Sequence, residues 1–562
     1  MFAFLASHFS RKEIILDLIF LLALVVAWFR PRLGSRIFDP AEKLAARVAA
    51  RLRLAIVLIA VIAVLVRLSL LELLPVPIPR VHDEFSYLLA ADTFAHGRVT
   101  NPPHPMWIFF ETFHVNQQPT YMSKYPPAQG AVLALGQALG HPWIGVLLGV
   151  AAMCAATLWM LQGWLPAPWA LLGAALVLLR LGIFTYWVNS YWGGAVAAIG
   201  GALVAGALPR ILRFQRWRDA VFLTVGAAIL ANSRPLEGLV FCVPVALVLL
   251  VWLFSKRSPP LRLNFSRVVL PICAVAVLCA SAMAYYNWRG TGSAFLFPYM
   301  VNEKAYSSTP TLFWQAARPP LHYRNPQFEA YYNGWAREYW SKNRLDSAAH
   351  VLKHVSLVFL KIIYFFLWPE LAFAFVALPW IFRDRRIRVL VVQASICFVG
   401  FLLVPWTEAH YAAPLVPVLF LLAVQGIRHW RAWSFAGRPI GIGFSRVIVL
   451  AAIFFAPFHH RSGTFEPETG QRPKIEQRAK VLADLKAMPG EHLVIVRYSP
   501  TAPDGGEWVY NDADIDHAKV VWARDIPNVD SRPLLDYFRG RNVWLAEPDA
   551  SPPRLTPYSN SR

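Results

Sequence analysis

Two adjacent carboxylates, Asp83 and Glu84, are the residues best placed for chemistry, and His82 and Tyr87 flank them. They follow closely after an apolar run that ends at residue 74. Charged groups beside lipid are costly unless they are paired or useful, so a functional role is one interpretation of this pair. A helix cap is an equally open interpretation, because Asp is favoured at the N-cap and acids are favourable in the first turn.

The composition indicates that these carboxylates belong to an α-helical polytopic membrane protein. Of 562 residues, 57% are hydrophobic and 15% are charged, whereas a typical soluble domain has about 25% charged residues. The apolar residues form runs near the length of about 20 that a membrane-spanning helix needs. The clearest runs are 55–74, 143–162, 236–254, 268–286, 358–382 and 389–405, and shorter ones are 14–29, 166–183, 194–209, 220–231, 412–427 and 447–458. Together they predict about 11–12 transmembrane helices.

The placement of the basic residues behind the net charge of +21 indicates the orientation of the chain in the membrane. Basic residues cluster at 30–53, 210–218, 256–267, 383–388 and 428–431. By the positive-inside rule these loops are cytoplasmic, and no nucleic-acid motif accompanies them, so no nucleic-acid partner is expected. The segments 75–140, 287–350 and 459–562 then lie outside, provided that 126–139 forms an interfacial or re-entrant helix that does not cross.

Three regions follow from this organisation. Residues 1–54 form an N-terminal hydrophobic helix and a basic cytoplasmic loop, and 55–458 form the transmembrane module. The tail, 459–562, is less apolar and predicts a small α/β domain outside the membrane. Its expected elements are helices at 474–488 and 532–540 and strands at 492–498, 519–523 and 542–546.

Four short motifs resemble, in the same order, those of lipid-linked-sugar glycosyltransferases with the GT-C fold. The resemblance is greatest to the protein mannosyltransferase and aminoarabinose transferase superfamily. The motifs are Asp83-Glu84, Lys124 before a Pro-Pro pair, the Arg234-Pro-Leu-Glu237-Gly turn, and His410-Tyr411 before a late helix, with His410 where the family has Arg. Ser86 stands where some relatives have Arg, and Ser123 stands where some have an acid directly before the Lys. The resemblance covers about 55–417.

The resemblance implies that Asp83 is the catalytic residue and that Lys124 binds the donor phosphate. The other expected site residues are Glu84 beside the base, Arg234, His410 and Tyr411 at the donor, and His82, Tyr87 and Glu237 in support. Arg234 and Glu237 could equally belong to an ordinary polar hairpin turn. Tyr411 could equally be an aromatic residue that anchors the chain at the membrane interface. The expected reaction moves one sugar from a polyprenyl phosphate to an acceptor hydroxyl, with inversion and with Asp83 as the general base.

The expected partners are this lipid-linked donor, a lipid, glycan or protein acceptor, and the membrane lipids. No cofactor and no metal site are predicted, although the question of a divalent metal stays open. A bacterial inner membrane, with the active site and the tail domain on the periplasmic side, is the expected location. The alternative function is a polytopic transporter or lipid flippase, which the sparse charges within the runs and the missing internal repeat disfavour. The aromatic side chains of 287–350 predict either an acceptor wall or interface anchoring.

Overall fold

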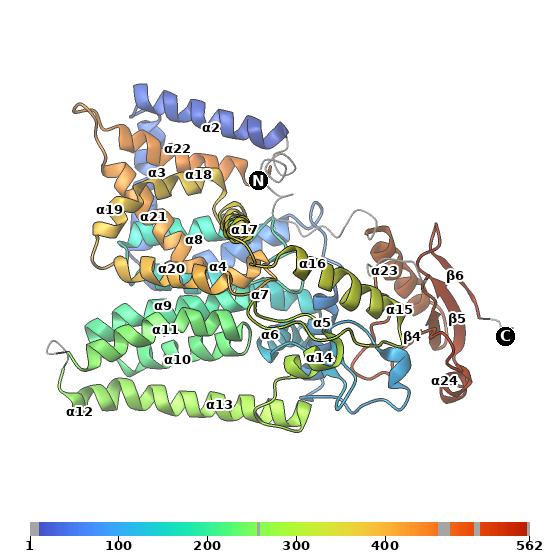
Figure 1. The fold of residues 1–562 in the computed structure, drawn as a ribbon. Helices are drawn as coiled ribbons and strands as arrows, with labels where there is room; N and C mark the ends of the chain where they lie inside the picture. The colour runs from blue at the N-terminus through green and yellow to red at the C-terminus, as the bar shows by residue number, and fades with distance from the viewer. Residues whose placement is uncertain (1–10, 256–258, 459–471, 500–505, 559–562) are drawn as a thin grey trace.

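A bundle of apolar helices with a small sheet domain at one end makes up the protein (Figure 1). The computed structural model describes residues 11–255, 259–458, 472–499 and 506–558. Within them, seven helical segments are long and apolar enough to cross a membrane. These are α4 (Leu52–Ser69), α7 (Pro142–Leu161), α9 (Ala195–Phe214), α11 (Pro235–Leu253), Arg262–Thr291, α17 (Ala348–Phe366) and Ala409–Ala432. The helical membrane fold and the small terminal α/β domain are therefore as predicted.

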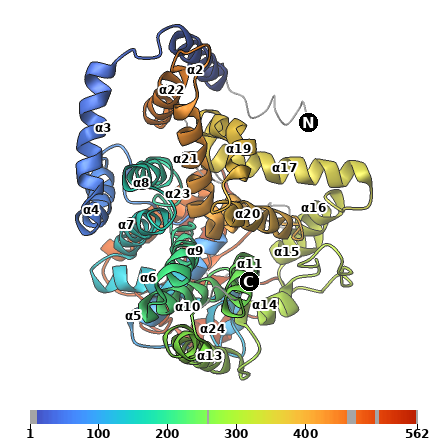
Figure 2. The same ribbon diagram turned by 90° about the vertical axis from the view of Figure 1, so that its left-hand side faces the viewer.

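Further helices complete the bundle. Three shorter apolar helices are α8 (Ala167–Leu181), α20 (Arg388–Phe401) and α22 (Ile440–Phe455). The remaining elements of this region are α2 (Arg11–Phe29), α3 (Ser35–Ala49), α10 (Trp217–Ala231), α12 (Leu261–Asn264), η2 (Phe265–Val269), α13 (Leu270–Thr291), η5 (Ala409–Leu415) and α21 (Val416–Ala432). Helices α9, α10, α11 and α13 run side by side in Figure 1, and their axes point at the viewer in Figure 2.

The apolar run 358–382 is not one span, contrary to the prediction. Helix α17 ends at Phe366, and α18 (Trp368–Ala372), η4 (Phe373–Ala377) and α19 (Leu378–Arg383) follow as short pieces. The break lies at Trp368, whose φ of 51° is left-handed, because the following Pro369 disfavours a helical conformation at the residue before it. Helix α17 is seen end-on in Figure 1 and lengthwise in Figure 2, so it lies steeply across the other helices.

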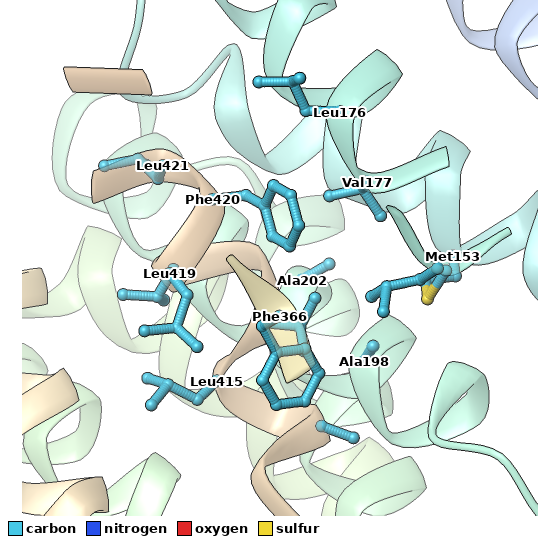
Figure 3. Packing of buried hydrophobic residues seen from close by; sticks show 14 of the residues in the cluster. Met153, Leu176, Val177, Ala198, Ala202, Phe366, Leu415, Leu419, Phe420 and Leu421 are labelled. Atoms are coloured by element: carbon cyan, nitrogen blue, oxygen red, sulfur yellow. The ribbon is translucent and has the colours of Figure 1, made fainter. Parts of the chain in front are cut away.

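The core of the bundle is made where five helices meet. Figure 3 shows Met153, Val177, Ala202, Phe366 and Phe420, from α7, α8, α9, α17 and α21, packed against one another. All five are buried apolar side chains, and such close packing lets each helix fix the position of its neighbours. The outer ends of α9, α11 and η5 are thereby held in place, and several predicted site residues lie there.

The first outer segment is a compact layer over those helix ends. It contains α5 (His82–Ala95), η1 (Trp107–Phe110), the antiparallel strands β1 (Val115–Asn116) and β2 (Met122–Ser123), and α6 (Pro127–Ala138). Helix α6 has 12 residues, too few to cross a core of about 30 Å, as predicted for 126–139. It packs tightly on α7, because a Cβ added at Gly136 would lie 2.2 Å from the backbone nitrogen of Gly145.

The second outer segment packs on the first. Its elements are α14 (Pro298–Tyr306), α15 (Pro326–Phe328), η3 (Glu329–Trp335) and α16 (Ala336–Lys342). Phe328 and Tyr332 form a buried aromatic cluster with Phe113 of the first segment. Part of the aromatic content of 287–350 therefore joins the two outer segments, and an acceptor wall stays a prediction.

The C-terminal domain is a four-stranded sheet with two helices, docked on the first outer segment. Its elements are α23 (Arg472–Ala487), β3 (His492–Val496), β4 (Val520–Arg524), α24 (Arg532–Tyr537), β5 (Asn542–Glu547) and β6 (Arg554–Pro557). The strand order is β4-β3-β5-β6, with β3 parallel to β4 and β5, and β6 antiparallel to β5. Leu493 and Ile495 pack against Phe109 and Phe110 of the outer segment. The five predicted tail elements are confirmed, and only the polar edge strand β6 was not predicted.

Candidate functional site

Glu84, rather than Asp83, caps helix α5. The Oε2 atom of Glu84 accepts the N–H groups of Arg80 (2.6 Å) and Val81 (3.1 Å), and Oε1 accepts the N–H of Tyr191 (2.9 Å). The side chain is 1% exposed, and burial raises its pKa to about 7 against the lowering effect of the N–H bonds. Both oxygens of Glu84 thus anchor the start of α5, and its expected part in catalysis stays a prediction.

Asp83 is left available for chemistry in the first turn of the same helix. Its side chain is 23% exposed, and its Oδ1 atom accepts a short hydrogen bond from the Tyr125 hydroxyl. The Nδ1 atom of His114 lies 3.2 Å from the Tyr125 oxygen and 3.7 Å from Asp83 Oδ1. Asp83 is thus an oriented carboxylate with one face open, which is the arrangement that a general base needs.

His114 is a site residue that the sequence did not reveal. Its backbone has a left-handed φ of 61°, and its carbonyl accepts hydrogen bonds from the Ser86 hydroxyl (2.6 Å) and from the Lys124 N–H (3.2 Å). Burial, and secondly the charge of Lys124, lower its pKa well below the usual 6.5. Neutral pH therefore leaves the imidazole uncharged beside Asp83. Because these contacts join residues of three different elements, no local motif signals them.

The predicted supporting residues His82 and Tyr87 lie on either side of Asp83. The Tyr87 ring stacks on Tyr125 with centroids 4.6 Å apart, so it fixes the ring whose hydroxyl reaches Asp83. The ring of His82 stacks on Phe113 at 4.5 Å, and its Nδ1 atom lies 2.8 Å from the Tyr510 hydroxyl of the C-terminal domain. Both side chains therefore position the start of α5.

Lys124 is buried and already has a carboxylate partner. Its Nζ atom lies 3.7 Å from Glu303 Oε1, and its side chain is 7% exposed. The rings of Tyr299 and Tyr125 lie 5.1 and 5.4 Å from the same atom. Lys124 lines a pocket with Asn232, on the side of α6 and α10. A bound phosphate would share this ammonium group with Glu303, a residue that the sequence motifs did not include.

Arg234 and Tyr411 approach the same centre from the helix ends. The Arg234 guanidinium lies 4.4 Å from the centre of the Tyr411 ring, directly before Pro235, which starts α11. The Glu237 carboxylate and the polar rings of Tyr87, Tyr411 and Tyr125 surround Arg234 closely enough to interact with its charge. The turn at 232–238 is therefore more than an ordinary hairpin, since it brings a cation to the tyrosines around Asp83.

A small, largely apolar groove with about 20 Å³ of free volume opens beside Tyr411. It is bounded by α11, α17, α20 and η5, and its walls include Val358, Ile362, Phe401, Val404 and Ala412. Its polar lining consists of Glu237, Lys361, Thr407, Glu408 and Tyr411. The sequence offered one signal for this site, since Lys361 is a lone lysine in an apolar run.

His410 forms part of the wall behind Tyr411. The ring is buried, with Trp192 at 4.5 Å and Tyr411 at 4.9 Å. Its Nδ1 atom lies 2.9 Å from the Tyr186 hydroxyl. His410 thus supports the Tyr411 ring and engages Tyr186 through Nδ1, and its expected donor contact stays a prediction.

The predicted residues converge although they lie far apart in the sequence. Tyr125 is their common neighbour: it bonds to Asp83, stacks on Tyr87, lies under Lys124 and interacts electrostatically with Arg234. Tyr411 in turn interacts electrostatically with Asp83 and Glu237. The site therefore combines an oriented carboxylate with two cations, Arg234 and Lys124, of which Lys124 lines a pocket.

No metal-binding cluster of three or more His, Cys, Asp or Glu side chains occurs in the parts of the chain that the structure describes. Several carboxylates of the site are engaged with cationic or hydroxyl partners, as Asp83 is with Tyr125 and Glu303 with Lys124. The expectation that no metal is bound stays a prediction, to be tested directly.

Several solved structures are similar to this chain. The oligosaccharyltransferase of Archaeoglobus fulgidus matches with a TM-score of 0.46 and 11% identity, over 81% of this chain and 64% of that one. ArnT from Cupriavidus metallidurans matches with a TM-score of 0.46 and 15% identity, over 87% of this chain and 92% of that one. The mycobacterial arabinofuranosyltransferase AftD matches with a TM-score of 0.38 and 13% identity, over 88% of this chain and 35% of that one. This chain spans less than two thirds of the length of the Archaeoglobus fulgidus oligosaccharyltransferase.

No family model and no curated protein matches the chain. Since every one of these TM-scores lies below 0.5, the activity of this chain has to be inferred from its own residues.

Proposed function

We propose that this protein is an integral membrane glycosyltransferase that moves a single sugar from a polyprenyl-phosphate donor to an acceptor hydroxyl. The observation that carries the proposal is the grouping of Asp83, Lys124 and Arg234 around Tyr125 at the outer ends of apolar helices. We place this site on the periplasmic face of a bacterial inner membrane, in agreement with the basic loops at the other end of the bundle.

The groove beside Tyr411 suits the donor lipid. Its apolar walls suit prenyl units, and Arg234 lies against Tyr411, one of its lining residues. Arginine and lysine are the side chains that usually bind phosphate. When the bond between sugar and phosphate breaks, negative charge grows on the phosphate, and cations held in a site of low dielectric constant stabilise that charge. Lys124, on the other side of Tyr125, supplies a second cation.

Asp83 acts on the acceptor. Its free oxygen takes the proton of the acceptor hydroxyl while the hydroxyl oxygen attacks the anomeric carbon. The new bond joins that carbon to the acceptor oxygen, the bond to the phosphate oxygen breaks, and the polyprenyl phosphate leaves with the electron pair. Attack opposite to the leaving group inverts the anomeric configuration. The hydrogen bond from Tyr125 holds the carboxylate in one rotamer for this step.

Substitution Asp83→Asn tests the assignment of the base. Positioned general bases contribute about 10²–10⁴-fold, so transfer of labelled sugar from polyprenyl-phosphate donors to acceptors in isolated membranes should fall by about this factor. Binding of a polyprenyl phosphate, measured by thermal shift, should persist. Glu338→Gln is a matched control, because Glu338 is an exposed acid of the second outer segment. Full activity of Asp83→Asn would remove Asp83 from the mechanism.

The alternative of a transporter or flippase makes a different prediction for the same variant. A flippase needs no general base, so lipid movement would continue in Asp83→Asn and no sugar transfer would be seen in the wild type. The packed apolar centre of the bundle in Figure 3 favours chemistry at the outer interface over a polar path through the helices.

A further inference from the structure

Helix α3 lies across the end of the bundle that is remote from the C-terminal sheet. Figure 2 shows it lengthwise between α2 and α4, at the edge of the bundle, while the neighbouring spans point at the viewer. It follows Gly34, whose φ of 75° turns the chain out of α2. An orientation across the helix ends places α3 in the plane of the membrane interface.

The acidic side chains of α3 form ion pairs with arginines of the bundle. The guanidinium of Arg446, on α22, bonds to Asp39 and lies 3.4 Å from Glu42. Arg431, at the end of α21, also bonds to Glu42. Both acids are thus neutralised from within the bundle, and they fix the rotation of α3 about its axis.

The opposite side of α3 carries an apolar ridge bordered by bases. Ile37 and Leu44 are seven residues apart, hence on one helix face, and they are 75% and 59% exposed. Arg36, Lys43 and Arg47 are also exposed and follow the same helical spacing beside that ridge. Asp39 and Glu42 remain 54% and 41% exposed, but their charges are offset by Arg446 and Arg431. The ridge and the bases beside it therefore keep an apolar and cationic character.

We propose that this side of α3, defined by Arg36, Ile37, Lys43, Leu44 and Arg47, is a binding surface for anionic phospholipids. The apolar ridge would enter the boundary between head groups and acyl chains, and the long basic side chains would extend along it to lipid phosphates. Charge complementarity selects anionic over zwitterionic lipid. It also disfavours a second copy of the chain, since two such surfaces would repel each other. The proposal does not depend on sugar transfer.

The test compares two triple variants of the full chain in detergent. Arg36→Gln/Lys43→Gln/Arg47→Gln removes the bases of α3, and Arg383→Gln/Arg385→Gln/Arg386→Gln removes the same charge from exposed residues of another basic loop. Short-chain phosphatidylglycerol or phosphatidylcholine is titrated, and the melting temperature and the lipids retained in native mass spectrometry are measured. Only phosphatidylglycerol should stabilise the wild type, with an apparent affinity on the order of 100-fold lower in the α3 variant and nearly unchanged in the control.

The outcomes are decisive in either direction. An equal loss of phosphatidylglycerol affinity in the two triple variants would mean that net charge alone attracts the lipid, and it would overturn the proposal. An unchanged affinity in the α3 variant would overturn it as well. So would equal stabilisation of the wild type by phosphatidylcholine. So would a lipid-independent dimer that the α3 variant dissociates. Ile37→Ser/Leu44→Ser alters exposed side chains only and should weaken phosphatidylglycerol binding without affecting folding, which separates insertion of the ridge from attraction by the bases.

Discussion

At the scale of single residues, the organisation of the site depends on Tyr125. Its hydroxyl bonds to Asp83, and its ring lies between Tyr87 and the ammonium of Lys124. The motif Asp83-Glu84 marks the place of the carboxylates, but only the fold separates their roles. One of them is buried among peptide N–H groups, whereas the other is open on one side.

Tyr125→Phe should lower activity while leaving the fold intact. The phenyl ring can keep the stack on Tyr87, but Asp83 loses the donor that holds its rotamer. We expect the transfer rate to fall about 10–100-fold, within the range of a misplaced catalytic group, with little change in melting temperature. The control Tyr537→Phe removes an exposed hydroxyl of the C-terminal domain. Wild-type kinetics in Tyr125→Phe would contradict a positioning role for this hydroxyl.

Glu84→Gln should lower stability in a pH-dependent way. An amide nitrogen cannot accept the N–H bonds that one carboxylate oxygen accepts, so a buried donor loses its partner, at a cost of about 1–3 kcal/mol. Burial raises the folded-state pKa from 4.5 to about 7, so the wild type loses stability as pH rises through that window. The variant lacks this titration.

The measurement is thermal unfolding of both proteins across that pH range. The stability gap between wild type and Glu84→Gln should be widest below about pH 4.5 and should narrow as pH approaches 7. A gap that widens with pH would show that Glu84 is charged in the folded protein. The exposed Glu338 gives a control, since Glu338→Gln replaces a carboxylate that is not buried.

At the scale of elements, periodicity and composition predict most of the helices and the tail strands. The break in the run 358–382 was missed because hydropathy counts apolar residues without registering the backbone, although Pro369 was a visible signal. The convergence of Asp83, His114 and Tyr125 could not be predicted. It depends on the packing of α5 against the loop that precedes α6, and no local pattern encodes such contacts between distant residues.

Gly136→Ala should disrupt the contact between α6 and α7. The added Cβ would lie 2.2 Å from the backbone nitrogen of Gly145, and overpacking of this kind costs about 1–3 kcal/mol. Because α6 follows directly after Lys124 and Tyr125, we expect lower activity together with a lower melting temperature. Gly334→Ala is the control, since only one atom, at 3.9 Å, lies near its added Cβ. An unchanged melting temperature in Gly136→Ala would contradict the close approach of the two helices.

At the scale of the whole molecule, the C-terminal domain is a structural part of the region that holds the candidate site. Tyr510 stacks on Phe85 at 4.0 Å, and its hydroxyl meets His82. The N–H of Ala513 donates to Asp92 at the other end of α5. Two points along one helix are thus held by one domain, and this helix carries Asp83.

Tyr510→Phe isolates this coupling from folding. The substitution keeps the ring that packs on Phe85 and removes only the hydroxyl that lies 2.8 Å from His82 Nδ1. If the domain positions the first turn of α5, turnover should fall several-fold, since about 1 kcal/mol of lost hydrogen bonding corresponds to this factor, while the melting temperature changes little. Tyr537→Phe, in the same domain, should leave turnover unchanged. The hydroxyl of Tyr510 is the hydrogen-bonded link between the C-terminal domain and the turn that bears Asp83. Equal turnover of Tyr510→Phe and Tyr537→Phe would therefore mean that the domain stabilises the outer layer without adjusting the position of Asp83.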